Sequence, residues 1–312
     1  MSHFGVITSS RDYLVAIAEG GVSGHTQFSK TGYNPAVTTS FEDVWPYGGL
    51  YAFPTTAVKM QIASDVATAD GDIGTILYDA TCDVGGTTTT LLDATYNWAV
   101  GTAAVGDILV VEKSGTTPEW GTITAVGTGV LTFSGGLSRG GSCVTARTYQ
   151  VLDVSAATGA MAVFIGFLDS TYAEKHEIMI LNTTTQVESI NTMLRVNNLT
   201  VIACGTKAGA TFAPIGNLAL RATGVASPFY SYTLAGFTRT RSGIYTVPLG
   251  KTLYVNKLMA SASTPNDTKI QTARAMLMAN TEPETDFLCG SIFYPHIELL
   301  SSNETVVMPL LI

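Results

Sequence analysis

Residues 106–134 read GDILVVEKSGTTPEWGTITAVGTGVLTFS, and they show most clearly which kind of structure this chain forms. Three short apolar runs, ILVV, ITAV and VLTF, are separated by Gly, Pro, Ser and Thr. Short runs rich in β-branched residues and bounded by turn formers are typical of β-strands. Because only short polar turns separate them, the three runs predict an antiparallel three-stranded meander.

The same pattern continues on both sides of this meander. Strand-like runs recur at spacings of about 8 to 12 residues, which is typical of sandwiches and barrels. They include AVKMQIAS, AVFIGFL, HEIMIL, LTVIACG, GIYTVPLG and TLYVNKLMASAS. A helix of one or two turns is predicted at 12–19, and 183–194 is compatible with either a short helix or a loop followed by a strand. The sequence therefore predicts a mainly β protein.

We expect four parts along the chain. Residues 1–55 form an N-terminal arm. Residues 56–75 together with 150–238 form a first β-sandwich of jelly-roll-like type, and 239–312 form a second. Between the two pieces of the first sandwich, 76–149 form a small inserted barrel-like β domain.

The core of the insert is predicted from its strand pattern. Its expected members are Leu91, Leu92, Trp98, Val105, Ile108, Val110, Ile123, Val126, Leu131 and Phe133. The alternative is that 76–149 add one more layer to a continuous sandwich.

The chain is unusually poor in charge. Of its 312 residues 46% are apolar and only 13% are charged, about half the share that is usual in soluble domains. No window approaches the ~20 apolar residues needed to cross a bilayer, so we expect no membrane association. Burying Thr and Ala costs far less than burying unpaired charges. This composition predicts a subunit of a larger assembly, and a soluble β protein with an uncharged surface is the alternative.

Net charge and cysteine spacing exclude further classes. With a formal charge of −8, the chain is not expected to wrap nucleic acid, and Arg239 with Arg241 is the nearest approach to a basic pair. The N-terminus lacks the order of a secretory signal, which predicts synthesis in the cytoplasm. The four cysteines have no zinc-like spacing. Cys82 and Cys143 could form a disulfide bond between the two ends of the insert, although free buried thiols fit a reducing cytosol better.

No catalytic residue, cofactor or metal site is expected. The chain has four histidines and no GxSxG elbow. Candidate carboxylate pairs or loose calcium ligands, all more typical of turns and solvated loops, are Glu42, Asp43, Asp65, Asp70 and Asp72. The glycine-rich stretches lack the context of a nucleotide-binding loop.

Residues 24–54, GHTQFSKTGYNPAVTTSFEDVWPYGGLYAFP, resemble a segment near the N-terminus of virion structural proteins of tailed bacteriophages, especially environmental and marine ones. The segment in those proteins is of the type GHSSVxKFGRNPDVDxxxxPEDVWDGGGxYxFP. The matching residues are Gly24, His25, Lys30, Gly32, Asn34, Pro35, Glu42, Asp43, Val44, Trp45, Gly48, Gly49, Tyr51, Phe53 and Pro54.

Later blocks continue this resemblance. ATGAMAVFIGFLDSTYAEKHEIMILN is similar to GTGARTVxIxGLDxxYxExSETVTLNG, and GIYTVPLGKTLYV is similar to xxYTVPAGKTxYI. Two departures remove charge: Met161-Ala162 replaces Arg-Thr, and His176-Glu177-Ile178 replaces Ser-Glu-Thr. They predict a different neighbour in the assembly at these positions. The insert resembles small, accessory barrel-like inserts of other phage structural proteins.

The resemblance implies a virion structural protein without enzymatic activity. We expect a capsid decoration (cement) protein, a homotrimer that binds the major capsid protein and other virion subunits after assembly in the host cytoplasm. Its expected interaction residues are Trp45, Tyr47, Tyr51, Phe53 and Trp120. A tail, neck or fibre-base component, a receptor- or glycan-binding module and an enzyme remain alternatives.

Overall fold

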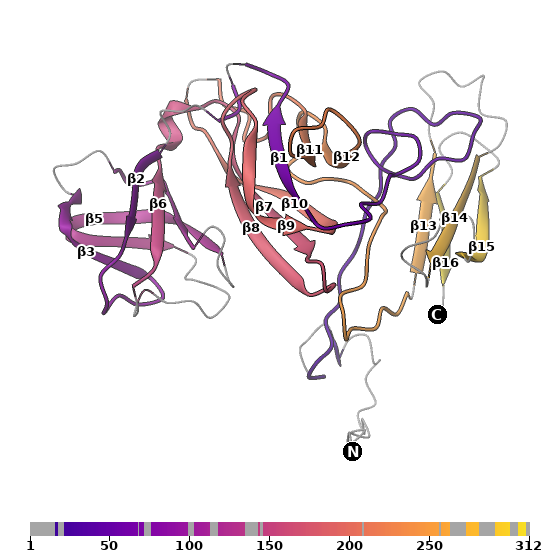
Figure 1. Cartoon of the computed structure of the whole chain (residues 1–312), viewed down its shortest axis with the longest axis horizontal. Helices are drawn as coiled ribbons and strands as arrows, with labels where there is room; N and C mark the ends of the chain where they lie inside the picture. Colours follow the sequence, from indigo (N-terminus) through magenta and orange to yellow (C-terminus); the bar gives the residue numbers. More distant parts are fainter. Residues whose placement is uncertain are drawn as a thin grey trace. The chain divides into compact units, whose positions relative to one another are not determined.

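The computed structural model describes residues 16–17, 22–67, 69–71, 76–98, 103–112, 118–134, 143, 146–207, 209–255, 257–262, 273–280, 291–299 and 305–309. These residues form a mainly β protein with several antiparallel sheets, as predicted (Figure 1). The chain divides into two compact units. One contains Met1–Ser170 with Glu174–Thr246, and the other contains Thr171–Ala173 with Val247–Ile312.

Two sheets of the first unit share one core. The four-stranded sheet has the order β12 (Phe229–Thr233), β11 (Leu218–Ala222), β1 (Val58–Ser64) and β9 (Val187–Met193). The three-stranded sheet has the order β10 (Arg195–Cys204), β7 (Ala160–Leu168) and β8 (Glu174–Ile180). Apolar side chains from both sheets form a single buried cluster, which includes Met60, Ile62, Val163, Ile165, Phe167, Leu199 and Leu220. Burial of this cluster holds the two sheets together.

The ambiguous segment 183–194 is a loop followed by a strand. Val187–Met193 is β9, and the turn before it closes with the Asn182–Thr185 bridge. In the predicted helix at 12–19, Ala16 and Ile17 lie within the described residues, and both are helical.

Residues 76–152 form a separate five-stranded sheet. Its order is β2 (Ile76–Thr81), β6 (Thr148–Leu152), β4 (Ile108–Val111), β5 (Glu119–Ser134) and β3 (Thr90–Asn97). The first run of the expected meander is β4, and the other two both belong to β5. A Cβ added to Gly121 would lie 2.8 Å from the carbonyl oxygen of Ser134, so the two ends of β5 lie side by side.

The predicted core of the insert is correct in part. Leu91, Trp98, Ile123, Leu131 and Phe133 are buried together, and Val126 packs against them. Val105 was predicted wrongly, because it lies in the turn before β4 and its side chain is exposed. Leu92 is half-buried.

Ile108 and Val110 are buried, but in a different cluster from the rest of the predicted core. They pack with Leu152, Phe164 and Ile178, so one face of the insert covers the outer face of the three-stranded sheet. Met161 and Ala162 are also members of this cluster. The residues that depart from the phage pattern, Met161, Ala162 and Ile178, therefore have the insert of the same chain as their neighbour.

The packing of the insert on the outer face of the three-stranded sheet explains the unbroken apolar run AMAVFIGFL. All nine residues of β7 are buried. Val163, Ile165 and Phe167 face the core between the two sheets, whereas Ala162 and Phe164 face the insert. A strand that is covered on both faces loses the alternation of apolar and polar residues.

The predicted strand GIYTVPLG does not form. Residues 243–248 have no regular structure. Asn197 satisfies both backbone groups of Thr246: its Nδ2 donates to the carbonyl oxygen at 2.7 Å, and its Oδ1 accepts from the amide at 2.9 Å. Pro248 has no N–H to donate to a ladder. A side chain of β10 therefore replaces the strand partner that the sequence pattern predicted.

The second unit contains two separate antiparallel pairs of strands among its described residues. β13 (Lys257–Ser261) pairs with β16 (Thr305–Pro309), and β14 (Ala273–Asn280) pairs with β15 (Ser291–Leu299).

Cys82 and Cys143 are buried in the core of the insert as thiols, not as a disulfide. Burial, together with the neighbouring Cys82, raises the pKa of Cys143 to about 12. Only the thiolate reacts with an aromatic disulfide reagent. In a Cys204→Ser/Cys289→Ser variant at pH 8, we expect Cys143 to react at least ~100-fold more slowly in the native protein than in urea. If Cys143 reacted equally fast in the native protein and in urea, it would not be buried.

Candidate functional site

The described residues contain no group of three or more His, Cys, Asp or Glu side chains that could hold a metal ion. Among the same residues, none of the helices has the length and apolar character needed to cross a bilayer.

Two histidine side chains are described, and both have local partners. His25 is exposed, with its Nδ1 3.2 Å from the carbonyl oxygen of Ser23. The ring of His176 stacks on Phe164 at 5.1 Å, and its Nε2 lies 3.6 Å from Glu174 Oε1. His3 and the side chain of His296 lie outside the described residues.

Glu42 and Asp43 organise the loops of the arm. Glu42 accepts hydrogen bonds from Thr38 and from Asn34 Nδ2, and these bonds hold its pKa below the usual range. Asp43 accepts the amide of Tyr51 at 2.7 Å, and burial raises its pKa. Both carboxylates thus close turns of residues 34–51.

Asp70 is a buried structural carboxylate. It accepts four hydrogen bonds, from Ser64 Oγ at 2.7 Å and from the amides of Ala160, Ile215 and Gly216 at 2.8, 3.0 and 2.7 Å. These donors fill its acceptor positions and join β1, β7 and the loop before β11. Asp65 is exposed and binds both the amide and the side chain of Asn217. Asp72 lies outside the described residues.

The structure brings together four of the five expected interaction residues. The ring centroids of Trp45 and Tyr47 are 5.5 Å apart, those of Trp45 and Tyr51 are 5.2 Å apart, and those of Tyr51 and Phe53 are 4.8 Å apart. Trp45 and Tyr51 are buried, whereas Tyr47 is exposed. The aromatic cluster therefore has an inner and an outer part.

Hydrogen bonds hold the buried part of the aromatic cluster, Trp45 and Tyr51, in place. Trp45 Nε1 donates to the carbonyl oxygen of Gly49 at 3.1 Å, and the hydroxyl of Tyr51 donates to the carbonyl oxygen of Tyr230 at 2.9 Å. Burial raises the pKa of Tyr51. Arg195 also donates to the carbonyl oxygen of Pro54, and its guanidinium lies 5.4 Å from the ring centre of Phe53. The segment is thereby anchored to β12 and β10.

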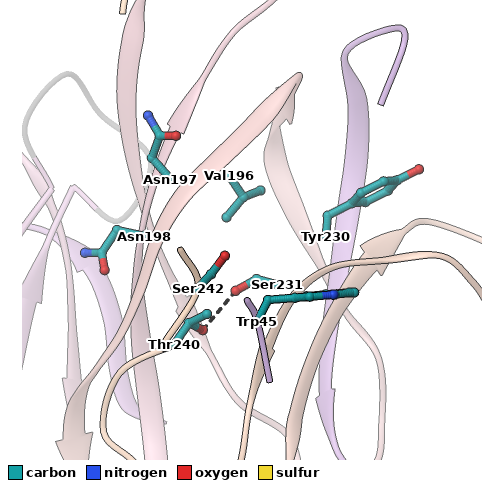
Figure 2. Close-up of a pocket in the computed structure, with 8 residues that line it drawn as sticks. All are labelled: Trp45, Val196, Asn197, Asn198, Tyr230, Ser231, Thr240 and Ser242. Atoms are coloured by element: carbon teal, nitrogen blue, oxygen red, sulfur yellow. Dashed lines mark hydrogen bonds between the residues drawn. The ribbon is translucent and has the colours of Figure 1, made fainter. Parts of the chain in front are cut away.

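A small hollow lies beside Trp45 (Figure 2). The centre of a water-sized sphere can occupy about 10 Å³ of it, and it is lined by Trp45, Val196, Asn197, Asn198, Tyr230, Ser231, Thr240 and Ser242. Ser231 Oγ and Thr240 Oγ1 are hydrogen-bonded to each other at 3.0 Å. One water molecule needs roughly 10 to 15 Å³ of such volume, so this hollow is far too small for a metabolite.

The outer part of the arm exposes large apolar side chains, which we call the arm surface. Its residues are Phe28, Tyr33, Val37, Phe41, Val44, Tyr47 and Leu50. Val37 and Phe41 are 71% and 77% exposed. The backbone beneath them is held in place, since Val44 accepts the amide of Gly243 at 2.7 Å and Tyr33 donates to Arg241 at 2.9 Å. Apolar side chains on an anchored backbone are suited to contact with another protein.

Sequence reasoning missed most of the arm surface. Val37, Phe41 and Leu50 lie in an irregular segment, and their spacing follows neither a helix nor a strand. The available signal was the presence of large apolar residues in a run of Gly, Pro, Ser and Thr.

Trp120 lies apart from the other four expected interaction residues. It is half-buried, its ring centre is 5.3 Å from that of Phe164, and it packs against the cluster between the insert and the three-stranded sheet. Much of its ring is therefore used in contacts within the chain.

No family model, curated protein or solved structure matches this chain.

Proposed function

We propose that this protein is a structural subunit of a tailed-phage virion, most specifically a decoration protein of the capsid. The arm surface is the observation that carries the proposal: seven large apolar side chains are exposed on a segment whose backbone is held by Trp45 and Tyr51. The resemblance of residues 24–54 to virion proteins supports the same function. The proposed partners are the major capsid protein, other virion subunits and two further copies of this chain.

The proposed mechanism is non-covalent. Each large apolar side chain that becomes buried contributes about 1.5 to 3 kcal/mol before the loss of freedom on binding is subtracted. Val37, Phe41 and Leu50 supply such side chains on one segment. A contact that buries roughly 1,000 Å² or more across the joint between capsomers would keep neighbouring subunits together against the pressure of packaged DNA.

The proposed architecture is a refinement of the observed sheets. The four- and three-stranded sheets of the first unit would form a jelly-roll-like sandwich around their shared core, and 76–149 would form a barrel-like insert. The second unit would be a second sandwich built from its two pairs of strands.

Add-back to particles that lack the protein tests this function. We expect such particles to lose resistance to heat and osmotic shock, and the wild-type protein to restore it. A Val37→Ser/Phe41→Ser variant should fold normally, because both side chains are exposed, and should bind particles at least ~10-fold more weakly. Ile190→Ser, at an exposed apolar position outside the arm, is the matched control and should bind like wild type.

Two results would count against the proposal. Particles without the protein could prove as robust as complete ones, or the arm variant could bind as tightly as the control. The copy number per particle separates the rival structural role: a high number indicates the head, and a few copies indicate the tail or neck.

A further inference from the structure

Arg239 and Arg241 line the same hollow on this acidic protein, and Lys30 lies near enough to Arg239 for their charges to interact. We call these three residues the basic cluster. Arg239 and Arg241 lie on the extended segment beside β10, where Arg239 forms a bridge with Thr200. Residues two apart in an extended segment face the same side, so both guanidinium groups leave the segment together. Both arginines are exposed, and Lys30 is half-buried.

Within the described part of the chain, none of these cations forms an ion pair. The Lys30 ammonium donates to the carbonyl oxygen of Asn197, and the Arg241 guanidinium lies over the ring of Phe237 at 4.2 Å from its centre. Burial and the nearby charge of Arg239 lower the pKa of Lys30 to about 8. Like charges held together without a counter-ion repel one another, and a bound anion would remove this repulsion.

The space beside the cluster is small and partly aromatic. A hollow too small to hold a water molecule is lined by Tyr33, Pro46, Leu234, Phe237, Arg239 and Arg241. A carboxylate would therefore bind over its mouth, on the two exposed guanidinium groups. Arginine side chains are well suited to binding a carboxylate, because each guanidinium can donate two parallel hydrogen bonds to it.

We propose that the basic cluster binds an acidic segment of a partner protein, with Arg239 and Arg241 holding a Glu or Asp carboxylate and Lys30 adding its charge beside them. The surroundings favour a protein over a nucleic acid. Tyr33 belongs both to this hollow and to the apolar arm surface, which a nucleic acid would leave uncovered. Three cations on a chain of net charge −8 are also few for a phosphate backbone.

The test uses the purified full-length protein and three probes: an end-blocked hexaglutamate peptide, the corresponding hexaglutamine peptide and a single-stranded DNA hexanucleotide. NMR titration should show binding of the glutamate peptide and little binding of the other two. The Arg239→Gln/Arg241→Gln variant should bind the glutamate peptide with a Kd about tenfold higher, since two exposed charge-assisted contacts are lost. Binding should weaken as salt rises above physiological strength.

Lys175→Gln/Lys207→Gln is the matched control, because it removes two exposed positive charges elsewhere on the first unit. Its Kd should stay within about twofold of wild type, and both variants should keep the wild-type Tm. The proposal is overturned if glutamate binds no better than glutamine, if the control loses as much affinity, or if DNA binds more tightly. Because no particle is involved, this result is independent of the add-back experiment and of the virion role.

Discussion

Replacement of Asp70 by Asn is expected to lower the free energy of unfolding by about 3 to 5 kcal/mol. The carboxylate accepts from Ser64 Oγ and from the amides of Ala160, Ile215 and Gly216, and it is completely buried. An amide of the same size keeps one oxygen but turns an NH₂ group towards other donors. At least one buried backbone N–H therefore loses its acceptor. Urea unfolding followed by tryptophan fluorescence measures the change.

Asp65→Asn makes the same chemical change five positions earlier, at an exposed site. It should alter the unfolding free energy by no more than about 0.5 kcal/mol. If the two variants were equally stable, Asp70 would not hold β1, β7 and the loop before β11 together. Should Asp70→Asn fail to fold at all, recovery of soluble protein by Asp65→Asn alone would still support the assignment.

Truncation of Trp45 to Ala is expected to destabilise the arm by about 3 kcal/mol or more. The indole is buried, contacts Tyr51 and donates to Gly49, so its loss opens a cavity and removes a hydrogen bond. The amides of Asp43 and Gly48, which are bonded to Gly49 and Trp45, should lose protection. Hydrogen exchange followed by mass spectrometry measures this loss.

Phe41→Ala is the control for this change, because the ring is 77% exposed. It should leave the exchange of Asp43 and Gly48 as in wild type. Together the two variants separate the inner part of the arm from its outer part. Unchanged protection in Trp45→Ala would mean that Trp45 does not anchor the segment.

Much of the strand pattern could be predicted, because period and β-branched content are local properties. AVKMQIAS, HEIMIL and LTVIACG contain β1, β8 and β10 or most of each. The strand predicted at GIYTVPLG does not form for a non-local reason, since Asn197, which bonds the backbone of Thr246, lies far away in sequence. Likewise, nothing within ILVV shows that Ile108 and Val110 face a second layer while Leu109 and Val111 face the core of the insert.

The candidate site was predictable only in its aromatic part. Trp45, Tyr47, Tyr51 and Phe53 are close in sequence, so their gathering needs little folding. Which of them is buried depends on Tyr230 and other residues of β12, and this could not be predicted from spacing. Arg239 and Arg241 are a pair already in the sequence, but Lys30 is distant from them along the chain and comes near Arg239 only on folding.

The double cover of β7 limits how this chain could be shortened. A variant without residues 76–152 would expose Met161, Phe164 and Ile178 to water, and an apolar face of this kind promotes aggregation. Such a variant should stay in solution only if positions 161, 162 and 178 carried polar side chains.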